Sequence, residues 1–111
     1  MKPPSKWPVA EPFATPWIQE ALRTVIDPEI GVNIVDLGLI YETRIEEAMV
    51  TVTMTMTTPA CPMTEMIVSD VKTSLQRAGD RITTVNVDVV WDPPWVPEMI
   101  SVEARERMGW R

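Results

Sequence analysis

Hydrophobic and polar positions alternate most regularly in the middle of the chain. From Met49 to Thr57, valine or methionine occupies nearly every second position and threonine occupies those between. A period of two predicts a strand whose valine and methionine face packs inward while its threonine face is wetter. Residues 39–45 predict a preceding strand, with a turn at 46–48, and alternating valines at 85–89 predict a third strand.

Two longer stretches repeat with the period of a helix. The first follows Thr15-Pro16, a cap residue and a proline suited to the first turn, and is expected to end at Ile26 because Asp27 precedes Pro28. The second ends near Gly79, and a short last helix is expected from Ser101 to Met108. The apolar positions of the two stretches are Ile18, Ala21, Leu22 and Val25, then Met63, Ile67, Val71, Leu75 and Ala78.

The elements therefore follow the order helix, strand, strand, helix, strand, helix. A hairpin followed by a helical crossover predicts an α+β two-layer sandwich, in which a small mixed sheet carries helices on one face. Residues 1–16 hold Pro3, Pro4, Pro8, Pro12 and Pro16 and lack a hydrophobic period. They predict a proline-rich arm outside a single domain of residues 17–111.

Composition narrows the function mainly through what is missing. The formal net charge of -6 argues against a nucleic-acid partner, because binding along phosphates needs a basic surface. There is no run of 18 apolar residues and no apolar signal core, so we expect a cytoplasmic protein without a membrane partner. The chain has no histidine, which excludes Ser-His-Asp and Cys-His catalysis and histidine-ligated metal sites.

The single cysteine, Cys61, follows the alternating strand at a Thr-Thr-Pro corner and precedes Pro62. Proline suits the first helical position, so Cys61 is predicted at the helix N-cap, where free N–H groups and the helix dipole favour a thiolate. A thiolate there is a nucleophile and a soft metal ligand, whereas the alternative is a small buried hydrophobe. Thr57 and Thr58 place two hydroxyls nearby that could bond a thiolate or ligand.

One thiol limits the metal chemistry that this chain can support. Iron–sulfur clusters usually take four protein ligands, mostly cysteine, and the chain has one cysteine and no histidine. A monomer is therefore not expected to hold a conventional cluster alone. Two chains across a symmetric interface could supply two thiols, with small thiols or a partner completing the set, so any cluster would be labile or shared.

The loop from Asp27 to Gly38 contains further candidates. The carboxylates of Asp27-Pro28-Glu29 could hold a hard cation or order the loop, although aspartate before proline is more often a turn former. Gly31 and Gly38 are expected at positions with unusual backbone angles. A phosphate-binding loop is disfavoured, because the chain has no nucleotide-binding glycine pattern.

Trp91 and Trp95 bracket a rigid Asp92-Pro93-Pro94 segment. Large rings of this kind are enriched at interaction hot spots, but packing against the core is the favoured alternative because each buried ring contributes so much apolar area.

Taken in this order, the motifs resemble the SufT and PaaD-like family of small iron–sulfur cluster assembly factors. The resemblance rests on A-L-R-T-V-I-D-P-E-I-G-V-N-I-V-D-L-G-L-I-Y at 21–41, T-T-P-A-C-P at 57–62, V-W-D-P-P-W at 90–95 and M-I-S at 99–101. It implies a fold like the C-terminal domain of NifU. It also implies an accessory factor in cluster assembly or transfer, not an enzyme, whose partners are the assembly machinery and apo-client proteins.

The resemblance further implies roles for individual residues. The family's cysteine falls on Cys61, as a transient ligand for iron, sulfur or a cluster. Its D-P-E turn and T-T-P corner fall on Asp27, Glu29, Thr57 and Thr58, which would gather around the thiol. NifU-type domains carry a Cys-x-x-Cys pair at this corner, whereas the second position here is Thr64.

A second class of function uses the same residues differently. The chain could be a protein–protein adaptor that binds through an acidic surface and the Trp91/Trp95 edge, with Cys61 structural. A thiol enzyme is disfavoured because the chain has no histidine and no second, resolving cysteine.

Overall fold

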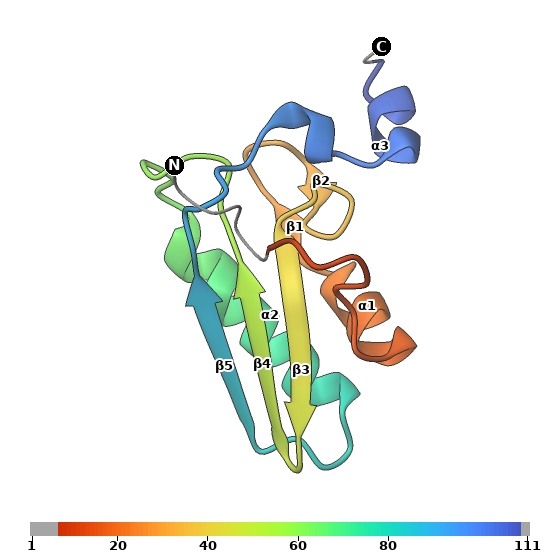
Figure 1. Cartoon of the computed structure of the whole chain (residues 1–111), viewed down its shortest axis with the longest axis vertical. Coiled ribbons are helices and arrows are strands. Elements are labelled where there is room, and N and C mark those ends of the chain that lie inside the picture. Colours follow the sequence, from red (N-terminus) through yellow and green to blue (C-terminus); the bar gives the residue numbers. More distant parts are fainter. Residues whose placement is uncertain (1–6, 110–111) are drawn as a thin grey trace.

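A mixed three-stranded sheet lies at the centre of the fold in the computed structural model, which describes residues 7–109 (Figure 1). β3 (Ile40–Glu46) and β4 (Met49–Met54) form an antiparallel hairpin, and β5 (Thr84–Val89) lies parallel to β4. The helix α2 (Thr64–Ala78) makes the crossover from β4 to β5, and α1 (Pro16–Leu22) packs beside it. The predicted α+β fold, with a small mixed sheet and a helical layer, is confirmed.

The smaller elements lie near the upper end of the sheet in Figure 1. The short strands β1 (Ile26–Asp27) and β2 (Val32–Asn33) pair with each other, and η1 (Pro97–Met99) is a single 3-10 turn. The last helix, α3 (Val102–Arg107), begins as predicted, because the Ser101 side chain accepts a hydrogen bond from the Ala104 N–H. Figure 1 shows α3 away from the sheet, so it is not part of the helical layer.

The two faces of β4 differ less in burial than the alternating sequence predicts. Val50, Val52 and Met54 are fully buried, as expected for the inward face. Thr53 and Thr55 are buried as well, so the prediction of a wetter threonine face is wrong at these positions. The Thr55 side chain lies near Tyr41, and the Tyr41 hydroxyl is bonded to the Pro93 carbonyl. Tyr41 and Pro93 both come from elsewhere in the sequence.

The first helix begins as predicted but ends earlier. The Thr15 side chain accepts a hydrogen bond from the Ile18 N–H, and Pro16 occupies the first turn. The helix stops at Leu22 instead of Ile26, because turn hydrogen bonds from Thr24 and Val25 redirect the chain. Ile26 is thereby free to pair with Asn33 across the β1–β2 hairpin.

The described part of the arm, residues 7–15, follows the edge of β3. The Val9 N–H donates to the Tyr41 carbonyl at 3.1 Å. The Thr43 hydroxyl accepts from the Ala14 N–H and donates to the Pro12 carbonyl, both at 2.8 Å. These bonds cover part of a strand edge that would otherwise expose unpaired backbone groups.

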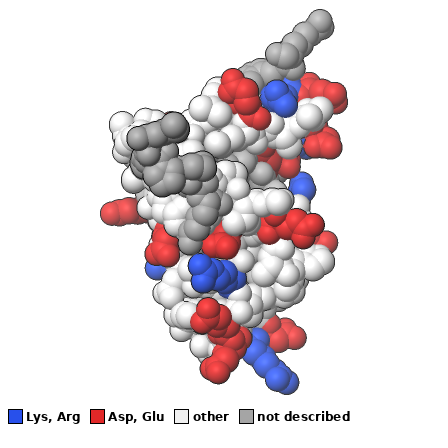
Figure 2. Space-filling model, viewed as in Figure 1, with Lys and Arg blue, Asp and Glu red and all other residues white. Residues whose placement is uncertain are grey.

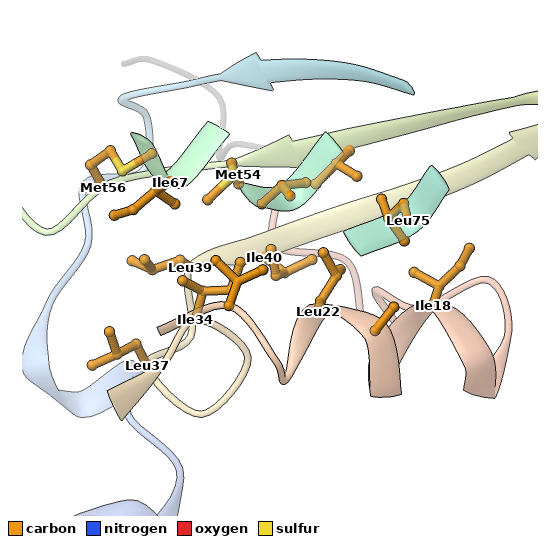
Figure 3. Packing of buried hydrophobic residues seen from close by; sticks show 14 of the residues in the cluster. Ile18, Leu22, Ile34, Leu37, Leu39, Ile40, Met54, Met56, Ile67 and Leu75 are labelled. Carbon is orange, nitrogen blue, oxygen red and sulfur yellow. The ribbon is translucent and has the colours of Figure 1, made fainter. Parts of the chain in front are cut away.

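The hydrophobic core fills the space between the sheet and the helices α1 and α2. Figure 3 shows Leu22 and Ile18 of α1 facing Leu75 of α2, while Met56 and Ile67 meet at the opposite end. No helix within residues 7–109 has the length and apolar character needed to cross a membrane.

Candidate functional site at the Cys61 corner

The corner that carries Cys61 lies where the two parallel strands end. The Val90 N–H donates to the Met54 carbonyl at 2.8 Å, which extends the β4–β5 pairing to the last residue of β4. Residues 55–63 then turn back into α2. Figure 1 shows this corner and the β1–β2 hairpin at the same end of the sheet.

Cys61 is not the N-cap of α2, so that prediction is wrong. The N-cap is Met63, which makes no side-chain capping bond, and the helix begins at Thr64. The reason is a tight turn in which the Cys61 N–H donates to the Thr58 carbonyl at 3.1 Å. This turn occupies Cys61 and delays the helix, so that Pro62 lies in the connecting turn.

The Cys61 side chain lies at the border between core and solvent. The residue is 9 % exposed, its thiol is free, and it belongs to the same apolar cluster as Met56 and Ile67. The neighbouring residues of the corner, from Thr58 to Ala60 and Pro62, are exposed. A small movement of the corner would therefore bring the thiol to the surface.

Two threonine hydroxyls hold the backbone of the corner. The Thr58 hydroxyl accepts from the Ala60 N–H at 3.3 Å, which engages it within the turn. The Thr64 hydroxyl donates to the Cys61 carbonyl at 3.0 Å. Thr57, the other predicted hydroxyl, is half-buried. The sequence did not predict this role for Thr64, which stands where NifU-type domains have a second cysteine. The signal was available, because a threonine hydroxyl commonly donates to the carbonyl three residues before it.

The predicted carboxylates shape a turn. Asp27 is 2 % exposed, its Oδ1 accepts from the Glu29 N–H at 2.9 Å, and its carbonyl accepts from the Gly31 N–H at 2.7 Å. This geometry matches the turn-forming alternative. Glu29 is exposed. Within residues 7–109, no group of three or more cysteine, aspartate or glutamate side chains is arranged to hold a metal ion.

Asp36 is a buried carboxylate that joins three parts of the fold. Its oxygens accept from Arg23 after α1 at 3.2 Å, from Arg107 of α3 at 2.9 Å and from the Asn33 amide at 3.0 Å. Its carbonyl also accepts from the Ser101 N–H at 2.7 Å. The carboxylate thus attaches α3 to the loop that leads into β3.

The two tryptophans have different environments. The Trp95 indole N–H donates to the Leu37 carbonyl at 2.7 Å, and its ring packs against the core. Trp91 is 45 % exposed and directly follows Val90, which is bonded to the end of β4. Of the two tryptophans, Trp91 is thus the more exposed to solvent.

Tyr41 lies beneath the segment that joins these rings. Its hydroxyl donates to the Pro93 carbonyl at 2.7 Å. Burial raises the pKa of Tyr41, the Thr55 hydroxyl lowers it to a smaller extent, and the Asp92 carboxylate raises it. The Thr55 hydroxyl itself is buried near the phenol and has no well-formed hydrogen bond to a described residue.

The two segments that contain the corner and Trp91 are acidic in sequence. No lysine or arginine occurs in residues 45–71, which contain the corner, or in residues 82–104, which contain Trp91, whereas Glu65, Asp88, Asp92 and Glu98 lie within them. Figure 2 shows acidic side chains scattered over one face of the molecule, without a continuous basic patch.

Several known proteins are similar to this chain in sequence and in structure. The chain is 43 % identical over 86 residues to the Fe-S protein maturation auxiliary factor SufT of Staphylococcus aureus, covering 77 % of this chain and 97 % of that protein. It is 40 % identical over 93 residues to the auxiliary factor YitW of Bacillus subtilis, covering 83 % of this chain and 90 % of YitW. A solved domain of unknown function from Bacillus anthracis superposes with a TM-score of 0.79 at 44 % identity, covering 85 % of this chain and 90 % of that one.

The region shared with the family includes the corner and the strands that support it. Residues 17–89 match the family described as iron-sulfur cluster assembly protein, and this range extends from α1 to the end of β5. The expected resemblance is confirmed over most of the chain. The chain belongs to the iron-sulfur cluster assembly protein family.

Proposed function

We propose that this protein is an accessory factor in the maturation of iron–sulfur proteins, with Cys61 as a transient ligand for iron, sulfur or a cluster. The observation that carries the proposal is the position of the chain's one thiol at an exposed corner within the region that matches the family. A soft thiolate suits iron, and a site at the border of core and solvent suits a ligand that must be passed on. Asp27 and Glu29 contribute by ordering the neighbouring hairpin, and Thr57 and Thr58 by supporting the corner.

The ligand set is completed by a second molecule. A cluster usually takes four protein ligands, and Asp27 and Asp36 already accept hydrogen bonds within the fold. A second copy of the chain, a small thiol or a partner from the assembly machinery then supplies the remaining ligands. The bound cluster is accordingly labile, and the apo-client is the acceptor.

Anaerobic reconstitution tests this proposal. The wild-type protein, incubated with ferrous iron and sulfide, is expected to gain iron, sulfide and a visible absorption band that Cys61→Ser lacks. Size-exclusion chromatography of the loaded sample separates a dimeric cluster from one shared with a small thiol. Equal iron and sulfide content in the two proteins contradicts direct ligation by Cys61.

The adaptor function is a second candidate, favoured by the exposure of Trp91. A tryptophan that is 45 % exposed in a segment without basic residues suits a partner with a basic, partly apolar face. Trp91→Ala is expected to reduce the capture of assembly partners, whereas Cys61→Ala leaves it unchanged. Val102→Ala, on α3, is a control for an exposed apolar side chain distant in sequence from Trp91. If Cys61→Ala weakens capture as much as Trp91→Ala does, the adaptor candidate is rejected.

A further inference from the structure

We infer that Thr64 is a positioning residue for Cys61: its hydroxyl holds the Cys61 carbonyl and thereby restricts how the thiol meets its ligand. This inference rests on the proposed function of Cys61. It assigns a role to a residue that lies one helical turn beyond the thiol, at the first position of α2.

The backbone of Cys61 is held on both sides. Its N–H donates to the Thr58 carbonyl at 3.1 Å, and its carbonyl accepts from the Thr64 hydroxyl at 3.0 Å. The direction of a cysteine side chain follows from the orientation of its own backbone, because only one freely rotating bond lies between Cα and sulfur. Two bonds on the backbone of one residue therefore limit the thiol to the few directions that its side-chain rotamers allow.

The start of α2 makes the Thr64 hydroxyl more important than an average side-chain donor. The N-cap, Met63, has no side-chain capping bond, so no polar group on that residue stabilises the first turn. The hydrogen bond from the Thr64 hydroxyl to the Cys61 carbonyl links the side chain of the first helical residue to the backbone of the corner. The rigid helix thereby anchors the turn that carries the thiol.

Burial gives this anchor a functional consequence. Cys61 as a whole is only 9 % exposed, although residues 58–60 and Pro62 beside it are exposed. With the Thr64 bond in place, the thiol is limited to few orientations at the surface of the core, which preorganises a single ligand atom. Without that bond, the corner can rotate and expose the thiol more often, but in many orientations. Alkylation of the free thiol then becomes faster while ligation of iron becomes weaker.

A set of three variants separates positioning from general stability. Thr64→Val removes the hydroxyl with little change in shape, Thr64→Ser retains it, and Thr73→Val makes the same substitution at an exposed position of the same helix. The rate of Cys61 alkylation by iodoacetamide is measured on the folded proteins, with the helical circular dichroism and thermal midpoint of each recorded alongside. Iron and sulfide content after anaerobic reconstitution is the second measurement.

Thr64→Val is expected to alkylate about 3-fold to 10-fold faster than wild type, the range that corresponds to the loss of one such hydrogen bond, and to retain less iron. Thr64→Ser and Thr73→Val are expected to stay within about 2-fold of wild type. Unchanged alkylation in Thr64→Val, equal acceleration in Thr64→Ser, or equal acceleration in Thr73→Val each overturns the inference. If Cys61→Ser binds iron normally, the proposed function fails, while the alkylation rates still decide whether Thr64 positions the thiol.

Discussion

The Tyr41 hydroxyl donates a 2.7 Å hydrogen bond to the carbonyl of Pro93, 52 residues further along the chain. This bond fastens the segment that follows β5 onto the beginning of β3. Trp95 strengthens the same attachment by donating to the Leu37 carbonyl. The end of the sheet that carries the Cys61 corner is thus closed by contacts between segments that are distant in sequence.

Tyr41→Phe tests the energy of this attachment. The substitution keeps the buried ring but leaves the Pro93 carbonyl without its donor, so the free energy of unfolding is expected to fall by about 1–3 kcal/mol. Urea denaturation followed by tryptophan fluorescence measures the change. Phe13→Leu, in the described arm, is a control for a small apolar change at a partly buried site. A loss below about 0.5 kcal/mol for Tyr41→Phe would show that the bond contributes little.

The pH dependence of stability provides a second test of the same residue. Because the folded-state pKa of Tyr41 is raised, the folded protein holds the phenolic proton more tightly than the unfolded chain does. This contribution is complete below the unfolded pKa of about 10 and is lost as the pH rises through the folded pKa. Stability is therefore expected to decline above about pH 10 in wild type and to decline less in Tyr41→Phe.

The phenolate absorbance provides a direct measurement, because Tyr41 is the chain's single tyrosine. In the folded protein the absorbance change should occur at a higher pH than in the protein unfolded by urea. Coincident titration curves in the two states would contradict the raised pKa.

Asp36→Asn is expected to loosen α3. The carboxylate is buried and bonded to Arg23 and Arg107, but both arginines are substantially exposed, with 47 % and 68 % of their side chains accessible. Solvent screening therefore reduces the expected loss of unfolding free energy to about 1–2 kcal/mol. Hydrogen exchange should show faster exchange of the Ala104 and Arg105 amides. Arg44→Gln, which breaks the exposed pair with Glu42, is the control and should cost less than about 1 kcal/mol.

The main elements could be predicted because their signals are local. Alternation at Met49–Met54 reflects one fully apolar strand face, and the 3.6-residue period of α2 reflects one buried helix face. The cap residues Thr15 and Ser101 act within four residues of themselves. The end of α1 could not be predicted in the same way. Val25 is buried as its spacing suggests, but in a turn that allows Ile26 to pair with Asn33.

In the candidate site, too, the features with local signals could be predicted and those that depend on a competing turn or on distant residues could not. Cys61 follows from its being the single thiol at a strand-to-helix corner, and the Asp27 turn follows from proline chemistry. The start of the helix at Thr64 accompanies the bond between Cys61 and Thr58, a turn that takes the place of the N-cap geometry predicted from Cys61-Pro62. Thr55 is buried near Tyr41, which lies on another strand, so local alternation could not reveal its burial.

Thr43→Val is expected to release the arm from the edge of β3. The Thr43 hydroxyl bonds both Ala14 and Pro12, so its removal should cost about 1–2 kcal/mol and expose residues 7–15 to protease more often. Limited proteolysis followed by mass spectrometry measures the rate of cleavage in this segment. Thr51→Val on the neighbouring strand is the matched control. Equal cleavage rates in Thr43→Val and wild type would mean that other contacts hold the arm.

Gly31 and Gly38 have nearly the same φ, so alanine substitutions at the two positions separate the effect of backbone strain from the effect of close packing. Gly31 and Gly38 have φ of +81° and +80°, but a Cβ on Gly31 would meet no atom within 4 Å, whereas a Cβ on Gly38 would overlap the Met99 carbonyl. Gly31→Ala is therefore expected to lose only the conformational term, about 1–2 kcal/mol of unfolding free energy. Gly38→Ala should lose about 2–5 kcal/mol, because the segment that leads into α3 must move as well. Chemical denaturation of both variants measures the difference. Equal losses would mean that the approach of Met99 to Gly38 adjusts without cost, and that the closure of this end of the sheet does not depend on it.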